Sequence, residues 1–214
     1  MLEFMINNNY FEIEKLENVV FIGFHERFDE LIQINDKFGI KTEIITSSDQ
    51  SKKISNKINF KIFDSFNKEF VSYIEKKIPN KKNTLFFSLS SRTIFNREKI
   101  EFFINNLINL HESRLPYDAG GAVYSWQILR EDRIAGITVH LIEKGIDSGP
   151  IIFSKRMLYP PSCIKPIDYK NFIDKNFLIF YEEFLSKLIN KNKLPLVYQS
   201  KYIGRYNPRL NDDQ

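Results

Sequence analysis

"NVVFIGFHERFDELIQINDKFGIKTEIITS" (residues 18–47) contains the pattern that decides the fold. An uninterrupted apolar run at Asn18–Gly23 predicts a buried strand, and Lys41–Ser47 predicts the next strand. Between them, apolar residues recur at helical spacing over Glu26–Gly39 and end at a glycine, as many helices do. The stretch therefore predicts a strand–helix–strand unit in which the two strands run parallel.

The same alternation continues along the chain. Further strands are expected at Ile58–Phe63, Thr84–Ser90 and Leu107–His111. Helices are expected between them at Lys68–Lys77 and Arg97–Asn105. Strands that alternate with helices indicate an α/β, Rossmann-like fold with a mainly parallel sheet flanked by helices. In sheets of this kind, ligands bind beyond the carboxyl ends of the strands.

The chain after residue 120 predicts one more helix and two more strands. The helix is expected at Gly121–Leu129, and the strands at Ile134–Glu143 and Ile151–Arg156. The loop Lys144–Pro150 joins the two strands and contains two glycines, which indicates a specific backbone path. These elements complete a Rossmann-like domain that we expect to cover residues 1–159.

A long helix is expected near the C-terminus, from Pro166 to Lys193. Its aromatic residues cover more than one face, which indicates burial against the sheet and against a second surface. We therefore expect residues 160–214 to form a small helical C-terminal appendage with a polar tail. We also expect the appendage to take part in a homodimer and in binding a substrate.

Composition limits the class of protein. At 214 residues with 43% hydrophobic side chains, the chain can bury a sizeable core. No apolar run approaches the ~18 residues of a membrane span, and the start, MLEFMINNNYFEIEK, lacks the order of a secretion signal. The one cysteine, Cys163, cannot form an internal disulfide. We therefore expect a cytoplasmic protein that does not bind membranes.

Several classes of site lack their signatures. The net charge of +4 comes from scattered lysines, without a zinc-finger, helix-turn-helix or RNP pattern, so no nucleic-acid partner is expected. The stretch IGFHERF has one glycine where a dinucleotide fingerprint has three, and no phosphate-binding P-loop is present. The three histidines, His25, His111 and His140, show no metal-ligand spacing, so no metal site is expected.

"INLHESRLPYDAGG" (Ile108–Gly121) ends an apolar run in polar residues. Asn109 and His111 stand two positions apart, so on a strand they project from the same face into the ligand crevice. The proline-and-glycine turn then leads the chain away from them. Asp147 lies in the later loop, between two glycines. Taken singly, these residues also suit a polar strand end and a turn aspartate.

Two blocks, "NLHESRLPYDAGG" and "AGITVHLIEKGIDSGPII", resemble the signature of the 10-formyltetrahydrofolate-dependent formyltransferases. That family includes glycinamide ribonucleotide transformylase, methionyl-tRNA formyltransferase and the sugar N-formyltransferases. The blocks span Asn109 to Ile152, and the preceding strands and helices fit the family's Rossmann-like domain. The resemblance thus covers roughly residues 18 to 156.

The resemblance implies that Asn109, His111 and Asp147 are the catalytic residues. When an amine attacks the formyl carbon, an oxyanion forms. Formyl transfer therefore needs a hydrogen-bond donor to that oxyanion and a group that takes the proton of the amine. Asn109 and His111 would donate to the oxyanion, and His111 would also exchange protons. Asp147 would orient His111 and relay protons through water.

The resemblance also implies 10-formyltetrahydrofolate as the formyl donor. Its pterin ring is expected between two loops, held mainly by main-chain groups. The expected folate-binding residues are Ser91, Arg92, Thr93, Ile94, Lys144, Gly145 and Ile146. Ser91 and Thr93 would equally suit the N-terminal cap of a helix.

The acceptor amine is expected on a nucleotide-linked amino sugar. Glu112 stands where the purine and tRNA enzymes commonly have proline. In this position the chain resembles the sugar N-formyltransferases that act on 4-amino-4,6-dideoxyhexoses. The segments YSWQIL (residues 124–129) and RYNPRLND (residues 205–212) also resemble that subgroup. The resemblance implies a substrate such as dTDP-4-amino-4,6-dideoxyglucose, used for O-antigen or another surface polysaccharide. The expected substrate-binding residues are Glu112, Tyr124, Trp126, Arg205 and Arg209.

Other readings stay open. Glycinamide ribonucleotide formyltransferase of purine synthesis is the main alternative. The tRNA enzyme carries an additional domain of ~100 residues, and the deformylase carries a preceding domain; we expect no room for either here. A catalytically inactive binding relative would not need all of Asn109, His111 and Asp147. Ala119-Gly120 departs from the family's usual Arg-Gly after the Leu-Pro turn.

Overall fold

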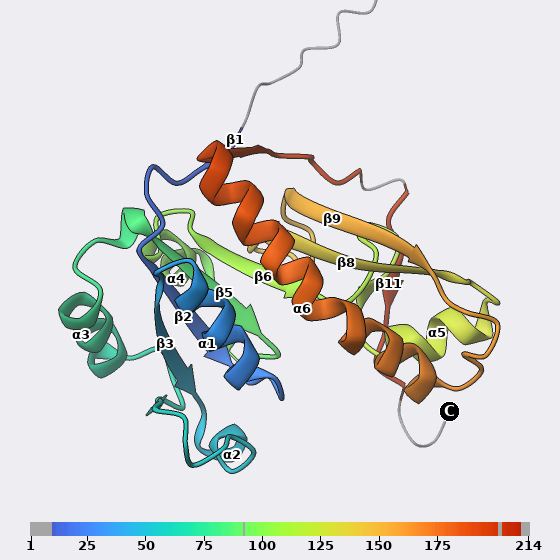
Figure 1. The fold of residues 1–214 in the computed structure, drawn as a ribbon, viewed down its shortest axis with the longest axis horizontal. Helices are drawn as coiled ribbons and strands as arrows, with labels where there is room; N and C mark the ends of the chain where they lie inside the picture. The colour runs from blue at the N-terminus through green and yellow to red at the C-terminus, as the bar shows by residue number, and fades with distance from the viewer. Residues whose placement is uncertain (1–9, 92, 201–202, 211–214) are drawn as a thin grey trace, which may run out of the picture.

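The computed structural model describes residues 10–91, 93–200 and 203–210 (Figure 1). Within these ranges the chain builds a central sheet of seven strands in the order β4-β3-β2-β5-β6-β8-β9. The strands β4, β3, β2, β5 and β6 run parallel to one another, whereas β8 is antiparallel to both of its neighbours, β6 and β9. The expected α/β fold with a mainly parallel sheet is therefore confirmed. The strands are β2 (Asn18–Gly23), β3 (Lys41–Thr46), β4 (Lys61–Ile62), β5 (Thr84–Leu89), β6 (Leu107–His111), β8 (Ile134–Leu141) and β9 (Ile151–Leu158).

The central strands are apolar on both faces because helices cover both faces. Along β2, Val19 and Phe21 join one hydrophobic core, whereas Val20 and Ile22 join the other. This division follows from the two-residue period of a strand. The continuous apolar run in β2 thus supplies both cores at once.

Two helices cover one face of the sheet, namely α1 (Phe28–Lys37) and α6 (Pro166–Lys191). In Figure 1, α6 runs obliquely in front of the half of the sheet that contains β8 and β9, and α1 lies in front of the half that contains β2 and β3. The opposite face packs against α3 (Lys68–Lys77), and Phe103, which follows α4 (Arg97–Phe102), joins the same core. A layer of helices on each side of a parallel sheet leaves the strand ends as the open edge where a ligand can bind.

Helix α6 begins and ends at sequence-encoded caps. Pro166 occupies its first turn, and the Asp168 carboxylate accepts hydrogen bonds from the backbone N–H groups of Ile164 and Lys165. The helix ends at Asn192, which adopts a left-handed conformation with φ 57°. Buried side chains of α6, including Phe177 and Phe184, share one core with β2, β5 and β8. Among the described residues, no helix is long and apolar enough to cross a membrane.

Several boundaries differ from the sequence-based expectation. The strand expected at Ile58–Phe63 is only two residues long, because both residues of β4 are exposed and contribute little to either core. Helix α1 begins two residues later than expected, at Phe28, and α4 stops at Phe102. Helix α5 (Val123–Leu129) and strands β8 and β9 lie where they were expected, with ends that shift by about two residues.

The C-terminal tail takes part in two small two-stranded sheets that the sequence pattern did not indicate. Strand β10 (Lys193–Pro195) pairs with β1 (Tyr10–Glu12), and β11 (Tyr206–Asn207) pairs with β7 (Ala119–Gly120). At Gly120, φ is +93° and a Cβ would lie 2.3 Å from the Asn207 carbonyl oxygen. Only glycine therefore allows the tail to approach the turn after β6 so closely.

Replacing Tyr181 with Phe should lower the melting temperature. The buried Tyr181 hydroxyl on α6 donates to Asn35 Oδ1 on α1 at 2.7 Å, and Asn35 Nδ2 donates to Thr42 Oγ1 at 2.8 Å. The variant leaves the buried Asn35 oxygen without this donor, which costs about 1–3 kcal/mol. For a chain of this size, that corresponds to a fall of about 2–4 °C per kcal/mol in thermal unfolding. Tyr10→Phe, at an exposed ring, is the control and should leave the melting temperature unchanged.

Candidate active site

One large cleft opens at the carboxyl ends of β5 and β6, with a volume of about 670 Å³. Its walls come from the loop after β5, the turn after β6, the start of α5 and the loop between β8 and β9. This volume lies in the range of small-molecule sites, roughly 300–1,000 Å³. The cleft also lies at the edge of the sheet where ligands of α/β proteins bind.

Asn109 and His111, near and at the end of β6, both line this cleft. The Asn109 side-chain nitrogen lies 3.2 Å from His140 Nε2 and 3.4 Å from Asp147 Oδ1. His140 lies on β8 directly opposite Asn109 in the strand pairing. The end of β6, the strand β8 and the loop after β8 thus bring four polar side chains together, namely Asn109, His111, His140 and Asp147.

The neutral His111 ring is held in one tautomer by the turn that follows it. His111 Nε2 lies 3.1 Å from the Asp118 carbonyl oxygen, which also accepts a hydrogen bond from the Ser113 hydroxyl at 2.6 Å. A carbonyl oxygen only accepts, so His111 Nε2 carries the proton and Nδ1 carries the lone pair. Asp147 Oδ2 lies farther from His111 Nε2, at 3.7 Å.

Asp147 is held by groups from three segments. The Gly120 N–H donates to Asp147 Oδ2 at 2.9 Å, and the Gln199 side chain donates to the Asp147 carbonyl oxygen at 2.8 Å. Asp147 has φ 49°, a left-handed conformation that aspartate tolerates better than most residues. Burial opposes its ionisation, but His140 and His111, when their rings are protonated, and the Gly120 N–H lower the pKa of Asp147 to about 2.

No role was predicted for His140, although it is 2% exposed and lies between Asn109 and Asp147 in the polar group. His140 Nδ1 lies 2.8 Å from the Leu141 carbonyl oxygen, so Nδ1 carries the proton in the neutral ring. Nε2 can then accept the Asn109 N–H, which fixes the orientation of that amide. In the sequence, His140 stands in an alternating strand inside the second signature block, but neither feature reveals the strand register that places it opposite Asn109.

The two loops expected to hold the folate face this cleft. Ser91, Thr93, Ile94, Lys144, Gly145 and Ile146 all line it, whereas Arg92 lies outside the described residues. Ile94 and Ile146 are 84% and 64% exposed, which is unusual for isoleucine side chains at a cleft. Apolar side chains beside open main-chain groups fit a flat heterocycle such as a pterin.

The substrate-binding residues expected from the sequence divide into two groups. Glu112, Tyr124 and Arg209 line the cleft. Trp126 and Arg205 do not line it. The Trp126 indole N–H donates to the Pro208 carbonyl oxygen, and the Arg205 backbone bonds to Pro116 and Ala119, so both residues fasten the tail.

Tyr206, which the sequence did not single out, lines the cleft from β11 and is 59% exposed. Its place depends on the pairing of β11 with β7, which brings the tail back to the turn after β6. Across the described ranges, no group of three or more His, Cys, Asp and Glu side chains could hold a metal ion. The cleft offers hydrogen-bond donors and acceptors, such as Asn109 and Asp147, and the aromatic ring of Tyr206.

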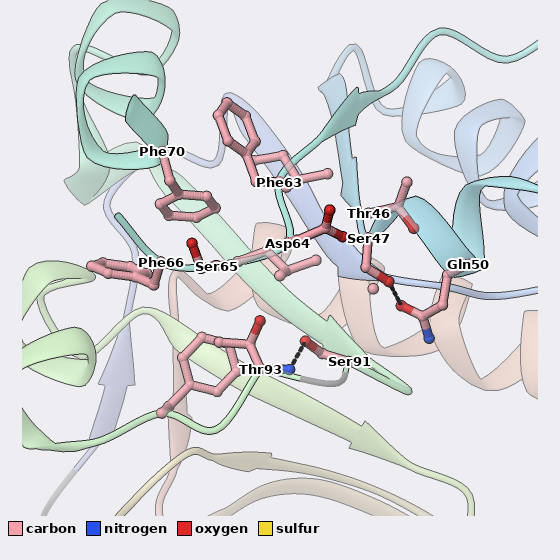
Figure 2. Close-up of a pocket in the computed structure, with 14 residues that line it drawn as sticks. Thr46, Ser47, Gln50, Phe63, Asp64, Ser65, Phe66, Phe70, Ser91 and Thr93 are labelled. Atoms are coloured by element: carbon pink, nitrogen blue, oxygen red, sulfur yellow. Dashed lines mark hydrogen bonds between the residues drawn. The ribbon is translucent and has the colours of Figure 1, made fainter. Parts of the chain in front are cut away.

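A second, smaller pocket lies at the carboxyl ends of β2 and β3 (Figure 2). Figure 2 shows the rings of Phe66 and Phe70 on one side of this pocket. Ser47 and Gln50 form a polar group on the other side; Gln50 lies in α2 (Ser48–Ser51), and Ser47 is the N-cap residue of that helix. Its free space is only about 50 Å³, enough for a few waters. The Thr46 hydroxyl is buried and has no hydrogen-bond partner among the described residues. The larger cleft is therefore the candidate active site.

A family model described as formyl transferase matches residues 46–161. The chain belongs to the formyl transferase family. The matched region contains β5, β6, β8, β9 and the loops between them, so the polar group in the cleft lies inside the family's shared segment. Family membership and the cleft thus rest on the same stretch of chain.

Formyl transferases of several kinds are similar to the chain. Methionyl-tRNA formyltransferase from Thermodesulfovibrio yellowstonii is 27% identical over 122 residues, covering 56% of this chain. The chain spans only 38% of the length of that relative.

Solved structures of formyltransferases share the fold, among them those of two enzymes. The formyltransferase PseJ from Anoxybacillus kamchatkensis, in complex with UDP-4,6-dideoxy-4-formamido-L-AltNAc and tetrahydrofolate, has a TM-score of 0.66 and 21% identity. The match covers 89% of this chain and 85% of PseJ. Phosphoribosylglycinamide formyltransferase from Bacillus halodurans has a TM-score of 0.66 and 18% identity, covering 82% of this chain and 96% of that one.

Thr46→Val should raise the melting temperature. Valine has the shape of threonine, suits the end of a strand and removes a buried hydroxyl that has no partner among the described residues. A gain of about 1 kcal/mol would raise the melting temperature by about 2–4 °C in calorimetry. Thr84→Val is the matched control and should lower it, because the buried Thr84 hydroxyl donates to the Asn80 carbonyl oxygen at 2.9 Å. A lower melting temperature for Thr46→Val would show that an ordered water or ligand bonds to the hydroxyl.

Proposed function

We propose that the protein transfers a formyl group from 10-formyltetrahydrofolate to the amino group of a nucleotide-linked sugar. The observation that carries this proposal is the meeting of Asn109, His111 and Asp147 in one cleft, inside the segment that the family model matches. The folate supplies the formyl group. The side chains of this chain bind the reacting groups, stabilise charge and move protons.

Asn109 and His111 are the proposed groups that stabilise the reaction. When an amine attacks a formyl carbon, negative charge develops on the formyl oxygen, and fixed N–H donors stabilise it. The Asn109 amide is already oriented by His140 and Asp147 and needs no change of protonation to donate. His111 can also take the proton that the attacking amine loses and pass a proton to the folate nitrogen that leaves when its bond to the formyl carbon breaks.

Asp147 is the proposed positioning and relay residue. Its low pKa keeps it ionised over the whole neutral range, so it can attract the positive charge that forms on the attacking amine or on His111. Since the Asp118 carbonyl oxygen is the nearer acceptor for His111 Nε2, the tautomer of His111 depends on the turn after β6 as well as on Asp147.

The folate is proposed to bind between the loop Ser91–Ile94 and the loop Lys144–Ile146. The exposed side chains of Ile94 and Ile146 would pack on the pterin ring, and main-chain groups would bond to its edges. Binding by main-chain groups explains why side-chain chemistry in these loops is not distinctive.

The proposed acceptor is a nucleotide-linked 4-amino-4,6-dideoxyhexose, with dTDP-4-amino-4,6-dideoxyglucose as the first compound to test. Support comes from PseJ, whose structure contains a nucleotide-linked formamido sugar and tetrahydrofolate together. In the cleft of this chain, Lys144 and Arg209 could bind phosphates, and Tyr206 could pack on a base. Such a product would serve the synthesis of O-antigen or another surface polysaccharide.

Glycinamide ribonucleotide is the second candidate acceptor, favoured by the nearly complete coverage of the Bacillus halodurans protein. The N-terminus of α1 counts against it. Helix N-termini after the first strand commonly bind phosphate, but here Asp29 and Glu30 occupy the first turn. The backbone N–H of Arg27 is also already bonded to His25 Nδ1 at 3.1 Å.

The decisive experiment is a formyl-transfer assay with 10-formyltetrahydrofolate and a panel of acceptors. The panel contains dTDP- and UDP-linked 3-amino and 4-amino sugars and glycinamide ribonucleotide, and mass spectrometry identifies the formylated product. Formylation of one or more amino sugar nucleotides supports the proposal. Formylation of glycinamide ribonucleotide alone contradicts it.

His111→Asn should lower kcat by ~10²–10⁴, because a positioned acid–base group contributes about that much. The affinity for folate should stay nearly constant, since the proposed folate loops do not include His111. The melting temperature should also change little, because His111 lines the cleft and belongs to neither hydrophobic core. Activity within a few-fold of the wild type would remove His111 from the mechanism.

Asp147→Asn should reduce activity about as much as His111→Asn, and the double variant should lose little more. Asparagine tolerates the left-handed backbone at this position, so the loop should keep its shape. The wild-type kcat/KM should rise with pH, because the attacking amine must lose its proton. Asp147 does not titrate in this range, since its pKa is about 2.

The pH profile tests the role of the Asp147 charge. Without it, the rising limb of kcat/KM should flatten or move along the pH axis. A profile parallel to the wild type, with only a modest loss of rate, would restrict Asp147 to shaping its loop.

A further inference from the structure

Glu112 lies beside the proposed catalytic residues, with its carboxylate held at both oxygens. The Tyr124 hydroxyl donates to Glu112 Oε2 at 2.9 Å, and His25 Nε2 lies 3.5 Å from Oε1. The Glu112 side chain is still 30% exposed and lines the cleft. A carboxylate has about four acceptor positions, so roughly two remain open toward the cleft.

The His25 ring is held in one orientation, with Nε2 facing Glu112. The ring is 8% exposed and stacks on Phe177, with centroids 4.2 Å apart and planes inclined by 16°. His25 Nδ1 accepts the backbone N–H of Arg27 at 3.1 Å. The proton of the neutral ring must therefore be on Nε2, the nitrogen that faces Glu112.

The basic side chains near Glu112 are already paired with other acids. Arg27 donates to Glu30 at 2.9 Å, and Lys170 lies 2.6 Å from both Glu26 and Asp174. Burial opposes the ionisation of Glu112, but the His25 and Tyr124 contacts bring its pKa below the ordinary value. Glu112 is thus an ionised carboxylate with open acceptor positions and no lysine or arginine partner among the described residues.

The position of Glu112 in the chain decides what it can contact. It lies one residue beyond the end of β6, and its carboxylate contacts His25 and Tyr124, whereas the Asn109 side chain contacts His140 and Asp147. The reacting amine must lie at the His111 side. Glu112 therefore faces another part of the acceptor, and the strong neutral donors of a sugar ring are its hydroxyl groups.

We propose that Glu112 accepts hydrogen bonds from two hydroxyl groups of the acceptor's sugar ring, and that His25 and Tyr124 position its carboxylate. This inference rests on the proposed sugar acceptor. In this scheme Glu112 recognises the substrate but does not take the proton of the amine. His25 is a positioning residue, because it acts only through Glu112.

Glu112→Gln tests the inference through binding and kinetics. Calorimetry measures the affinity for dTDP-4-amino-4,6-dideoxyglucose and, as the matched ligand without a sugar, for dTDP. Loss of hydrogen bonds to a charged group should weaken binding of the sugar nucleotide ~10-fold or more and leave dTDP binding unchanged. With an acceptor that the wild type formylates, KM should rise by a similar factor while kcat stays within a few-fold.

Two substitutions test the positioning role of His25. His25→Phe keeps a ring on Phe177 but removes the N–H, so the sugar nucleotide should bind several-fold more weakly. His25→Gln offers an amide N–H to Glu112 and should recover most of that loss. Glu26→Gln is the control, because Glu26 pairs with Lys170 outside the cleft, and it should bind like the wild type.

The outcomes separate this inference from the proposed function. If the wild type formylates no amino sugar but still binds the sugar nucleotide through Glu112, the function fails and the subsite stands. Equal binding by the wild type and Glu112→Gln would overturn the subsite, as would an equal loss for dTDP and the sugar nucleotide. If the wild type binds no sugar nucleotide, both are wrong.

Discussion

The antiparallel pairing of β6 with β8 is the contact on which the site depends. It places Asn109 opposite His140, and His111 opposite Thr138. A shift of one residue would turn Asn109 and His111 to the other face of the sheet. The apolar neighbours prevent that shift, because Leu110 and Val139 are paired in the same ladder and both are buried in the core beneath α6. The hydrophobic core thus fixes the positions of the polar side chains.

The C-terminal tail stabilises the same site from another direction. Strand β11 pairs with β7 at Gly120, whose N–H donates to Asp147. The side chain of Gln199, in the same tail, donates to the carbonyl oxygens of Asp147 and Gly149. The position of Asp147 therefore depends on three segments that are far apart in the sequence. A family signature can show that an aspartate belongs at this place, but only the folded chain shows what holds it there.

Local pattern was sufficient for most of the fold. The apolar run of β2 and the helical spacing that ends at Gly39 depend on neighbouring residues only, and β2 forms at the expected residues while α1 forms inside the expected range. The pattern failed where the outcome depends on distant contacts. His140 gained a partner only through the strand register, and Tyr206 reached the cleft only through the pairing of β11 with β7. The substrate contact expected of Trp126 stays a prediction, and its indole N–H donates to the Pro208 carbonyl oxygen in the tail.

The acidic and basic side chains of the cleft restrict where the phosphate groups of an acceptor can lie. Asp147 and Glu112 both lie inside it as carboxylates, each stabilised by a histidine and a further donor. Two ionised carboxylates in one cleft repel a phosphate group placed between them. Among the described lining residues, the lysine and arginine side chains are those of Lys144 and Arg209, and both residues are exposed. An acceptor with its diphosphate near the exposed basic residues and its uncharged sugar ring between the carboxylates satisfies this distribution. A compact acceptor, with its phosphate close to the amine, would bring negative charge toward Glu112.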